Sequence, residues 1–253
     1  MAYEPAVSAV VLAGRANEGV FRELSDAPNE ALIDIAGRPM LAYVLDALTG
    51  SKSVRKVVVV GTPDVDAHLP DGIDLLRAGD DVIANASLGL AAVDQHQPAL
   101  IVTSDIPLIT PEVIDGFVRQ CLTRPAELYY PAIPRGDAEG RFPNVKRTYA
   151  KLREGTYTGG NVFMIDPRVA SKLASRAREF VAARKSPAKM AGLLGPMFLA
   201  KLLLGALSVR ELEVKVSRMF GVKGVVVITH SVEIGVDVDK VSDLELVRQA
   251  LAR

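Results

Sequence analysis

The sequence predicts an α/β protein built on one mixed, mostly parallel β-sheet, with an added β region and a helical insertion in its second half. Short runs that are apolar at nearly every position alternate with longer stretches whose apolar residues recur at helical spacing. Strands that helices cover on both faces have this continuous apolar character, and crossover helices supply the amphipathic stretches between them. A chain of 253 residues can bury a core of its own, so we expect one domain spanning residues 1–253.

The first half of the chain alternates between expected strands and expected helices. Thr110 precedes Pro111, and a capping hydroxyl followed by proline in the first turn marks the start of a helix. We expect strands over residues 7–13, 56–61 and 99–103, and helices over residues 39–48, 82–93 and 111–122.

The second half departs from this alternation. From about residue 127 to residue 167, Gly and Pro interrupt short β-prone runs, which predicts a β region rather than another strand–helix–strand unit. Near the end of the chain, Ser242 and Glu245 have the spacing of a capping box, which predicts a last helix that ends near Leu251.

The apolar segment 190–207 is long enough to raise the question of a membrane span. Lys201 and Pro196 fall within it and three glycines weaken a continuous helix, so we expect two short buried helices instead. They belong to the helical insertion, at about residues 186–220. We expect the segment to serve as a core element, a lid or the interface of a homo-oligomer, and membrane-surface contact is the alternative.

Composition excludes several classes of protein. The 30 basic and 30 acidic residues cancel, so the chain lacks the broad positive field that attracts nucleic acids and anionic membranes. We therefore expect no nucleic-acid partner and no stable membrane insertion. A single cysteine, Cys121, rules out internal disulfides and multi-cysteine metal sites. Residues 1–5 lack the pattern of a signal peptide, and we expect a cytoplasmic protein.

Polar residues that follow the expected strands are the first candidates for function, because ligands of open α/β sheets bind beyond the carboxyl ends of the strands. The first strand runs into Leu12-Ala13-Gly14-Arg15, where a glycine lets the backbone approach a phosphate. The spacing fits neither the dinucleotide-binding glycine pattern nor a P-loop. An ordinary strand-to-loop turn is therefore the alternative interpretation.

Three acidic residues also follow expected strands. Asp105 ends a buried strand, and since Thr110 already caps the next helix, Asp105 is either a metal ligand or a hydrogen-bonded buried Asp. Asp237 and Asp239 lie two residues apart before the last helix, and residues at this spacing in an extended segment point to the same face. With Ser242 as the expected cap, Asp239 is left to bind a metal or to pair with a nearby Lys or Arg.

Five segments carry a family resemblance when they are taken in chain order: residues 11–14, 37–41, 102–108, 158–161 and 237–244. They resemble the MobA-like nucleotidyltransferases, a family named for molybdenum cofactor guanylyltransferase, and the similarity extends over nearly the whole chain. It implies a Rossmann-like fold of the glycosyltransferase-A type, with a nucleotide-binding half at about 1–126 and an acceptor-binding half at about 127–253. It further implies an enzyme that moves a nucleoside monophosphate from a nucleoside triphosphate to a phosphorylated acceptor, molybdopterin-like or a sugar phosphate, with Mg²⁺ as cofactor and pyrophosphate as product.

The resemblance also implies roles for individual residues. Asp105 and Arg15 are the expected catalytic residues, and Asp105, Asp239 and Asp237 are the expected Mg²⁺ ligands. The residues expected to bind the nucleotide are Leu12, Ala13, Gly14, Arg15, Gly79, Asn85, Ser87 and Ser104.

The chain departs from the family pattern in two places. In the loop that usually reads Gly-Gly-x-Gly-x-Arg, Arg15 replaces the second glycine and Asn17 the third, and Glu30 stands where the family has a lysine. Nucleotidyl transfer depends on cations around the negative charge that develops in the transition state. Arg15 and Arg22 are therefore the candidates to supply the positive charge that is lost with the lysine. The alternative is a non-catalytic nucleotide or sugar-phosphate binding or regulatory protein on the same fold.

The β region is the expected acceptor site, because basic residues gather there in a neutral chain. Arginine makes bidentate phosphate contacts, glycine permits close approach, and asparagine bonds hydroxyl groups. A solvated hairpin with a glycine turn is the alternative interpretation. The residues expected to bind the acceptor are Arg147, Thr148, Lys151, Gly159, Gly160 and Asn161.

Overall fold

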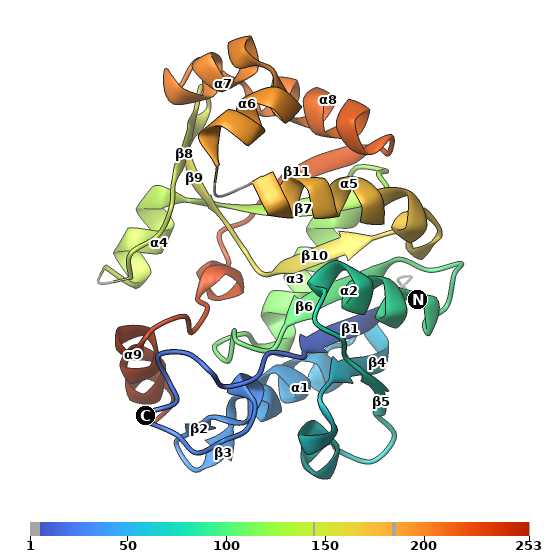
Figure 1. The fold of residues 1–253 in the computed structure, drawn as a ribbon, viewed down its shortest axis with the longest axis vertical. Helices are drawn as coiled ribbons and strands as arrows, with labels where there is room; N and C mark the ends of the chain where they lie inside the picture. Colours follow the sequence, from blue (N-terminus) through green and yellow to red (C-terminus); the bar gives the residue numbers. More distant parts are fainter. Residues whose placement is uncertain (1–5, 144, 184–185, 253) are drawn as a thin grey trace.

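The computed structural model describes residues 6–143, 145–183 and 186–252. Within them, nine strands form one mixed sheet in the order β5-β4-β1-β6-β10-β7-β9-β8, with β11 paired to β7 (Figure 1). This architecture confirms the predicted α/β class. Residues 1–5, whose sequence argued against a signal peptide, lie outside the described part of the chain.

The first half of the chain builds the parallel part of the sheet. β1 pairs in parallel with both β4 and β6, and β4 pairs in parallel with β5. The carboxyl ends of these strands therefore share one edge. The elements are β1 (Val7–Ala13), β4 (Val54–Gly61), β5 (Asp74–Arg77) and β6 (Ala99–Thr103), with α1 (Met40–Gly50), α2 (Val82–Ala91) and α3 (Pro111–Leu122) between and after them.

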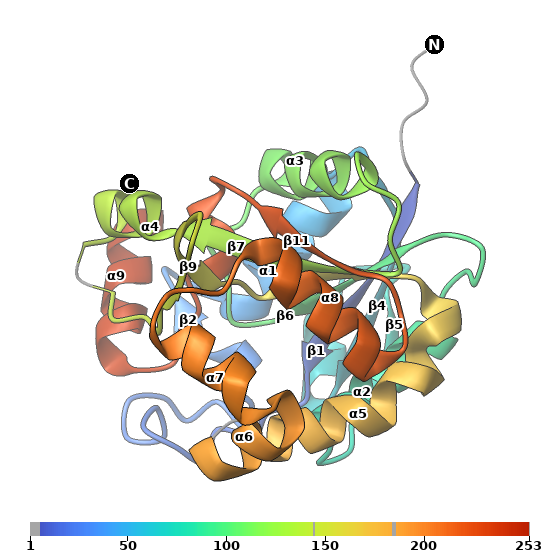
Figure 2. The ribbon, with the colours of Figure 1, turned by 90° about the horizontal axis from the view of Figure 1, so that it is seen from above.

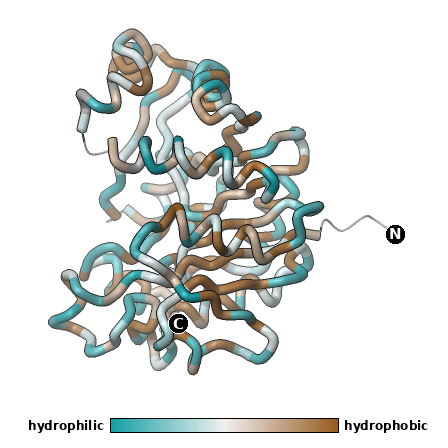
Figure 3. Tube along the Cα trace, turned by 45° about the vertical axis from the view of Figure 1, so that its right-hand side comes forward, coloured by the Kyte–Doolittle hydropathy of each residue, from teal (hydrophilic) through white to brown (hydrophobic). Residues whose placement is uncertain are grey.

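Alternate side chains of β1 face two helix layers, which explains its uninterrupted apolar sequence. Ala9 and Val11 pack with α1 and α3 in one cluster. Val10 packs on the opposite side with α2 and α5 (Ala170–Ala183). Figure 2 shows these helix pairs on the two faces, and Figure 3 shows the hydrophobic residues concentrated along the central strands. Gly89 permits this packing, since a Cβ there would lie 2.1 Å from Val10 Cγ1.

The second half adds antiparallel strands. β10 (Val162–Ile165) pairs antiparallel with β6 and joins it to β7 (Leu128–Pro134), so both halves share one sheet. The predicted β region is thus present, although it also contains a short helix, α4 (Arg135–Arg141), that the sequence did not suggest. Beyond β7 lie the hairpin of β8 (Ala150–Leu152) and β9 (Gly155–Gly159), and β11 (Gly224–Ile228), which is parallel to β7.

The helical insertion consists of α6 (Pro187–Leu194), α7 (Pro196–Leu203) and α8 (Val209–Phe220). Two short helices were predicted for segment 190–207, but their predicted burial is wrong for α7, which has no buried residue. Met197 is 72% exposed and Leu203 78% exposed. The reason is that α7 packs on one side only, against β8 and its helical neighbours. No helix in the described residues is both long and apolar enough to cross a membrane.

The segment that leads into the last helix differs from the prediction in two respects. Asp237 and Asp239 follow a short 3-10 helix, η4 (Val232–Gly235), rather than a strand. Helix α9 (Val241–Leu251) is capped by Asp243, whose carboxylate accepts hydrogen bonds from the backbone N–H groups of Asp239 and Lys240. The predicted capping box of Ser242 and Glu245 is therefore wrong.

A buried carboxylate joins the end of α1 to α3. Asp115 accepts hydrogen bonds from Ser51 Oγ at 2.6 Å, from the Ser53 N–H at 3.0 Å and from the Lys52 N–H at 3.2 Å. Burial alone would raise the pKa of Asp115, but these hydrogen bonds outweigh it and hold the pKa below its usual value. The ionised form of Asp115 therefore stabilises the fold.

Replacing Asp115 by Asn should destabilise the protein by about 2 kcal/mol at neutral pH, because a charged acceptor is lost from three donors. Urea unfolding measures this change. Because the pKa of Asp115 is lower in the folded state than in the unfolded state, its ionised form stabilises the fold at pH values above the unfolded-state pKa. The difference in free energy of unfolding between Asp115→Asn and wild type should therefore narrow as pH falls below about 4. The control is Asp46→Asn, which breaks an exposed ion pair with Arg38 and should cost less than about 1 kcal/mol. Equal losses in the two variants would contradict this account.

Candidate functional site

The ends of β1 and β6 lie together at the carboxyl edge of the sheet. The N–H of Ser104, directly after β6, donates to the carbonyl of Leu12 at 3.2 Å. Ser104 and Ala13 are buried, and Leu12 is half-buried. The structure thus joins two segments that the sequence singled out separately.

Gly14, Gly79 and Asn85 also converge at this edge. A Cβ on Gly14 would lie 2.7 Å from Ala78 Cβ and 3.3 Å from Asn85 Nδ2. The Asn85 side chain exchanges two hydrogen bonds of 2.8 Å with the backbone of Gly79. Ser87 is two residues further along α2, and its hydroxyl donates to the Ile83 carbonyl within the helix at 2.8 Å. Residues at this spacing do not share a helix face, so Ser87 is separated from Asn85.

Two asparagines organise the loop that follows β1. The Asn17 side chain donates to the carbonyls of Ser25 and Ala27. Asn29 is fully buried, and its amide nitrogen donates to the Ala13 carbonyl at 2.8 Å and to Thr62 Oγ1 at 2.9 Å. Asn29 was not among the predicted site residues, although an asparagine before a short helical turn is a common cap.

The C-terminal carboxylates lie beside Asp105. The backbone N–H of Val238 donates to the Asp105 carbonyl at 2.9 Å, which places Asp237 and Asp239 next to the end of β6. Asp105 and Asp237 are half-buried, whereas the Asp239 side chain is 62% exposed. The Thr103 hydroxyl donates to Asp105 Oδ1. The three predicted acidic residues thus meet, although they lie far apart in the chain.

These carboxyl groups perturb one another. Burial raises the pKa of Asp105, the Thr103 hydrogen bond opposes this, and the charge of Asp239 adds to the increase. Burial, followed by the charges of Asp105 and Asp239, raises the pKa of Asp237 to about 7. A cation bound among these carboxylates would relieve their repulsion.

Glu30 is a fourth member of the cluster. Its carboxylate is buried and pairs with Arg15, Nε to Oε2, at 3.1 Å. Burial raises the pKa of Glu30 against the opposing effect of Arg15, and the charges of Asp105 and Asp239 raise it further. Arg15 also reaches Asp239, Nη1 to Oδ1, at 3.7 Å. The sequence showed Glu30 only as a departure from a family pattern, so its membership is new.

The donor set suits a hard divalent cation such as Mg²⁺. Mg²⁺ is usually bound through one or two protein carboxylates together with substrate phosphates and water. Across the residues described, no group of three or more His, Cys, Asp or Glu is arranged to hold a metal ion by itself.

Two of the predicted acceptor residues adjoin this cluster. The N–H of Asn161 donates to the Ile234 carbonyl at 2.8 Å, and its own carbonyl accepts from the Thr103 N–H at 3.3 Å. Burial lowers the pKa of Arg147, and the charge of Asp237 opposes this. Arg147 Nε and Nη2 are buried without a hydrogen-bond partner among the described residues, which leaves two donors for an anion.

The other predicted acceptor residues have different surroundings. A Cβ on Gly159 would collide with the Tyr130 hydroxyl at 2.1 Å, and one on Gly160 with Ile234 Cγ2 at 2.6 Å, so both glycines accommodate packing within the protein. Thr148 is exposed. The Lys151 side chain packs against Gly205, between α7 and α8.

Comparisons with known proteins bear on the fold and the family of the chain. The chain is 37% identical to a hypothetical transferase from Thermus thermophilus, with a TM-score of 0.85, over 94% of this chain and 99% of that one. It is also 36% identical over 95 residues to 3-deoxy-manno-octulosonate cytidylyltransferase of Neisseria meningitidis serogroup B. These residues cover 35% of this chain and only 37% of the length of that relative. A CMP:2-keto-3-deoxy-manno-octonic acid synthetase complexed with CTP shares the fold, with 14% identity and a TM-score of 0.61 over 98% of both chains.

A family model matches most of the chain. The model for the MobA-like NTP transferase domain covers residues 9–208, which include most of β1, the Arg15 loop, Asp105 and the predicted β region at about 127–167. The chain therefore belongs to the MobA-like NTP transferase family.

Proposed function

We propose that this protein is a Mg²⁺-dependent nucleotidyltransferase that moves a nucleoside monophosphate from a nucleoside triphosphate to a phosphorylated acceptor. The observation that carries the proposal is the gathering of Asp105, Asp237, Asp239 and Glu30 around Arg15 at the carboxyl ends of β1 and β6. In the reaction, an acceptor phosphate oxygen attacks the α-phosphorus. The bond from that phosphorus to the bridging oxygen breaks, and pyrophosphate leaves with the electron pair.

The nucleotide is assigned to the first half of the chain, at about 1–126. The side chains of Ala78 and Asn85 occupy the side of Gly14 where a Cβ would lie. The Gly14 backbone is assigned to a phosphate, and Gly79 and Asn85, which are joined by two hydrogen bonds, are assigned to the base. Arg15 is 66% exposed on its side chain, so it can turn donors to the triphosphate while Glu30 fixes its orientation. Arginine donors to phosphate oxygens stabilise the charge that develops in the transition state.

Asp105 and Asp239 are the proposed Mg²⁺ ligands, with Asp237 as a third ligand or an orienting neighbour. When bound, the ion draws charge from the α-phosphate and stabilises the leaving pyrophosphate. The mutual repulsion among these carboxylates supports this assignment.

The acceptor is assigned to the second half, at about 127–253. The unpaired donors of Arg147 suit an acceptor phosphate, and Asn161, between the end of β6 and η4, suits a hydroxyl group. Thr148, Lys151, Gly159 and Gly160 remain proposed members of this site, although the packing of both glycines gives them a structural role as well.

The function is tested by measuring pyrophosphate release with each of the four ribonucleoside triphosphates and a panel of phosphorylated acceptors. CTP is the first choice, because one relative is named a cytidylyltransferase. Mg²⁺-dependent release with at least one pair is expected. A thermal shift with a triphosphate but no release would favour the non-catalytic binding protein, and neither response would reject both functions.

Asp105→Asn and Asp239→Asn should each lower Mg²⁺-dependent pyrophosphate release by about 100-fold or more, because each removes charge from the site where it is needed in the transition state. Steady-state assays over a range of Mg²⁺ concentrations measure the loss. Asp71→Asn, at an exposed position away from the cluster, is the matched control and should retain activity. Unchanged metal dependence in both site variants would rule out the shared Mg²⁺ site.

Arg15→Gln should weaken triphosphate binding about ten- to a hundredfold, since a charge-assisted phosphate contact contributes about 1.5–3 kcal/mol. Calorimetric titration gives the affinity. Arg119→Gln changes an exposed arginine on α3, outside the site, and serves as the control. If the two variants lose affinity equally, Arg15 has no special contact with phosphate.

A further inference from the structure

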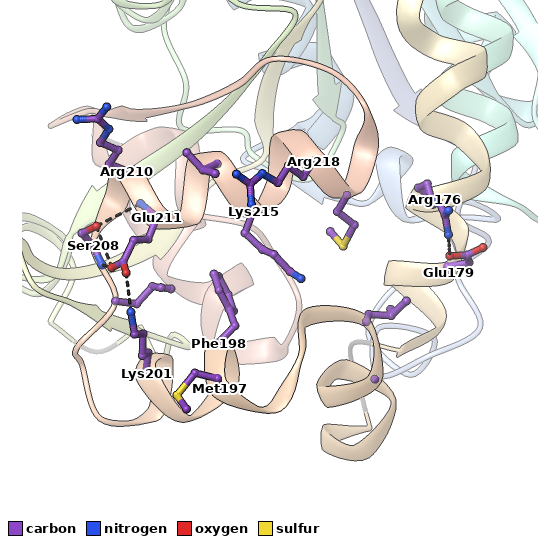
Figure 4. A pocket seen from close by; sticks show the side chains of 15 residues that line it. Arg176, Glu179, Met197, Phe198, Lys201, Ser208, Arg210, Glu211, Lys215 and Arg218 are labelled. Carbon is purple, nitrogen blue, oxygen red and sulfur yellow. Dashed lines mark hydrogen bonds and ion pairs between the residues drawn. The ribbon is translucent and has the colours of Figure 1, made fainter.

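A groove of about 830 Å³ lies in the helical insertion, between α8 and the helices α5, α6 and α7 (Figure 4). None of its lining residues belongs to the site described above. Its apolar lining includes Phe198, Leu193, Val214 and Met219. Helices α7 and α8 have no buried residue, so their apolar sides are incompletely covered.

The groove is strongly basic in a chain of zero net charge. Five basic and two acidic residues line it, and both acids are already paired, Glu179 with Arg176 at 2.9 Å and Glu211 with Lys201 at 2.7 Å. Three further cations, Arg210, Lys215 and Arg218, have no ion-pair partner in the described residues. Lys215 points into the groove, with Nζ 6.0 Å from the centre of the Phe198 ring. The groove therefore offers positive charge beside apolar surface.

Large apolar side chains also project outside the groove. Leu203 and Leu204 are each 78% exposed and do not line it, while Met197 lines it and is 72% exposed. A ligand confined to the groove would leave both leucines in water. A bilayer surface would cover them and would also bring anionic headgroups to the cations.

We propose that α7 and the basic groove form a docking site for an anionic lipid bilayer, with Met197, Leu203 and Leu204 in the interface and Arg210, Lys215 and Arg218 on the headgroups. Charge decides against a second copy of the chain as the occupant. A two-fold interface would bring together two copies of a face that carries three unpaired cations and no unpaired acid among the described lining residues. Such docking is reversible and peripheral, because the apolar helix is too short to span.

Co-sedimentation of the full chain with vesicles tests the proposal. We expect binding to phosphatidylcholine vesicles that contain about one third phosphatidylglycerol, little binding to pure phosphatidylcholine, and weaker binding as salt rises. The double variant Leu203→Ser/Leu204→Ser should bind at least about tenfold more weakly. Lys215→Gln/Arg218→Gln should lose about fivefold in affinity per cation removed.

Matched controls are Leu122→Ser and Arg119→Gln, which change an exposed leucine and an exposed arginine on α3. Both should bind like wild type, and thermal melts should show all variants folded. Binding that does not depend on the anionic lipid, or that is unchanged in both double variants, would overturn the proposal. A concentration-dependent dimer that the double leucine variant abolishes, without vesicle binding by wild type, would assign the face to a second copy and would also overturn it. Pyrophosphate release is assayed separately and does not decide this question.

Discussion

The hydrogen bond from the Val238 N–H to the Asp105 carbonyl joins the two halves of the acidic cluster. It fastens the segment before the last helix to the end of β6, although the two lie far apart in the chain. Asp243 supports it from the other side by holding the N–H groups of Asp239 and Lys240. The buried side chains of Val236 and Val238 and the hydrogen bond from Asn161 to Ile234 hold the same segment, so the C-terminal carboxylates have a fixed position relative to Asp105.

In the acidic cluster, burial and the charge of Arg15 have opposite effects on the carboxylates. Four carboxylates gather near the guanidinium of Arg15, and burial disfavours ionisation of Asp105, Asp237 and Glu30. Arg15 offsets part of this cost by bridging Glu30 and Asp239. The two departures from the family pattern are thus physically linked. An arginine and a glutamate at unexpected positions form one ion pair, so neither substitution can be interpreted without the other.

The sequence was sufficient for elements whose burial leaves a periodic signal. The strands 7–13 and 99–103 and the helix 111–122 match the structure because each buries defined faces. Contacts between distant segments leave no such signal, which is why the Glu30–Arg15 pair and the buried Asn29 were missed. The acidic residues were expected to meet because strand ends share one edge of a sheet. Asp237 and Asp239 instead reach that edge after η4, through the contact of Val238 with Asp105. Burial of segment 190–207 was predicted from hydropathy alone, but hydropathy does not say whether a partner surface exists.

The asparagine contacts of the loop after β1 have a kinetic consequence. Asn17 and Asn29 hold that loop to Ser25, Ala27, Ala13 and Thr62 through contacts within the protein itself. Its conformational entropy is therefore lost when the chain folds, and a ligand arriving at Gly14 meets a receptor that is already organised. Association should then follow a single encounter step whose rate rises linearly with ligand concentration, without the plateau that a slow loop closure would impose.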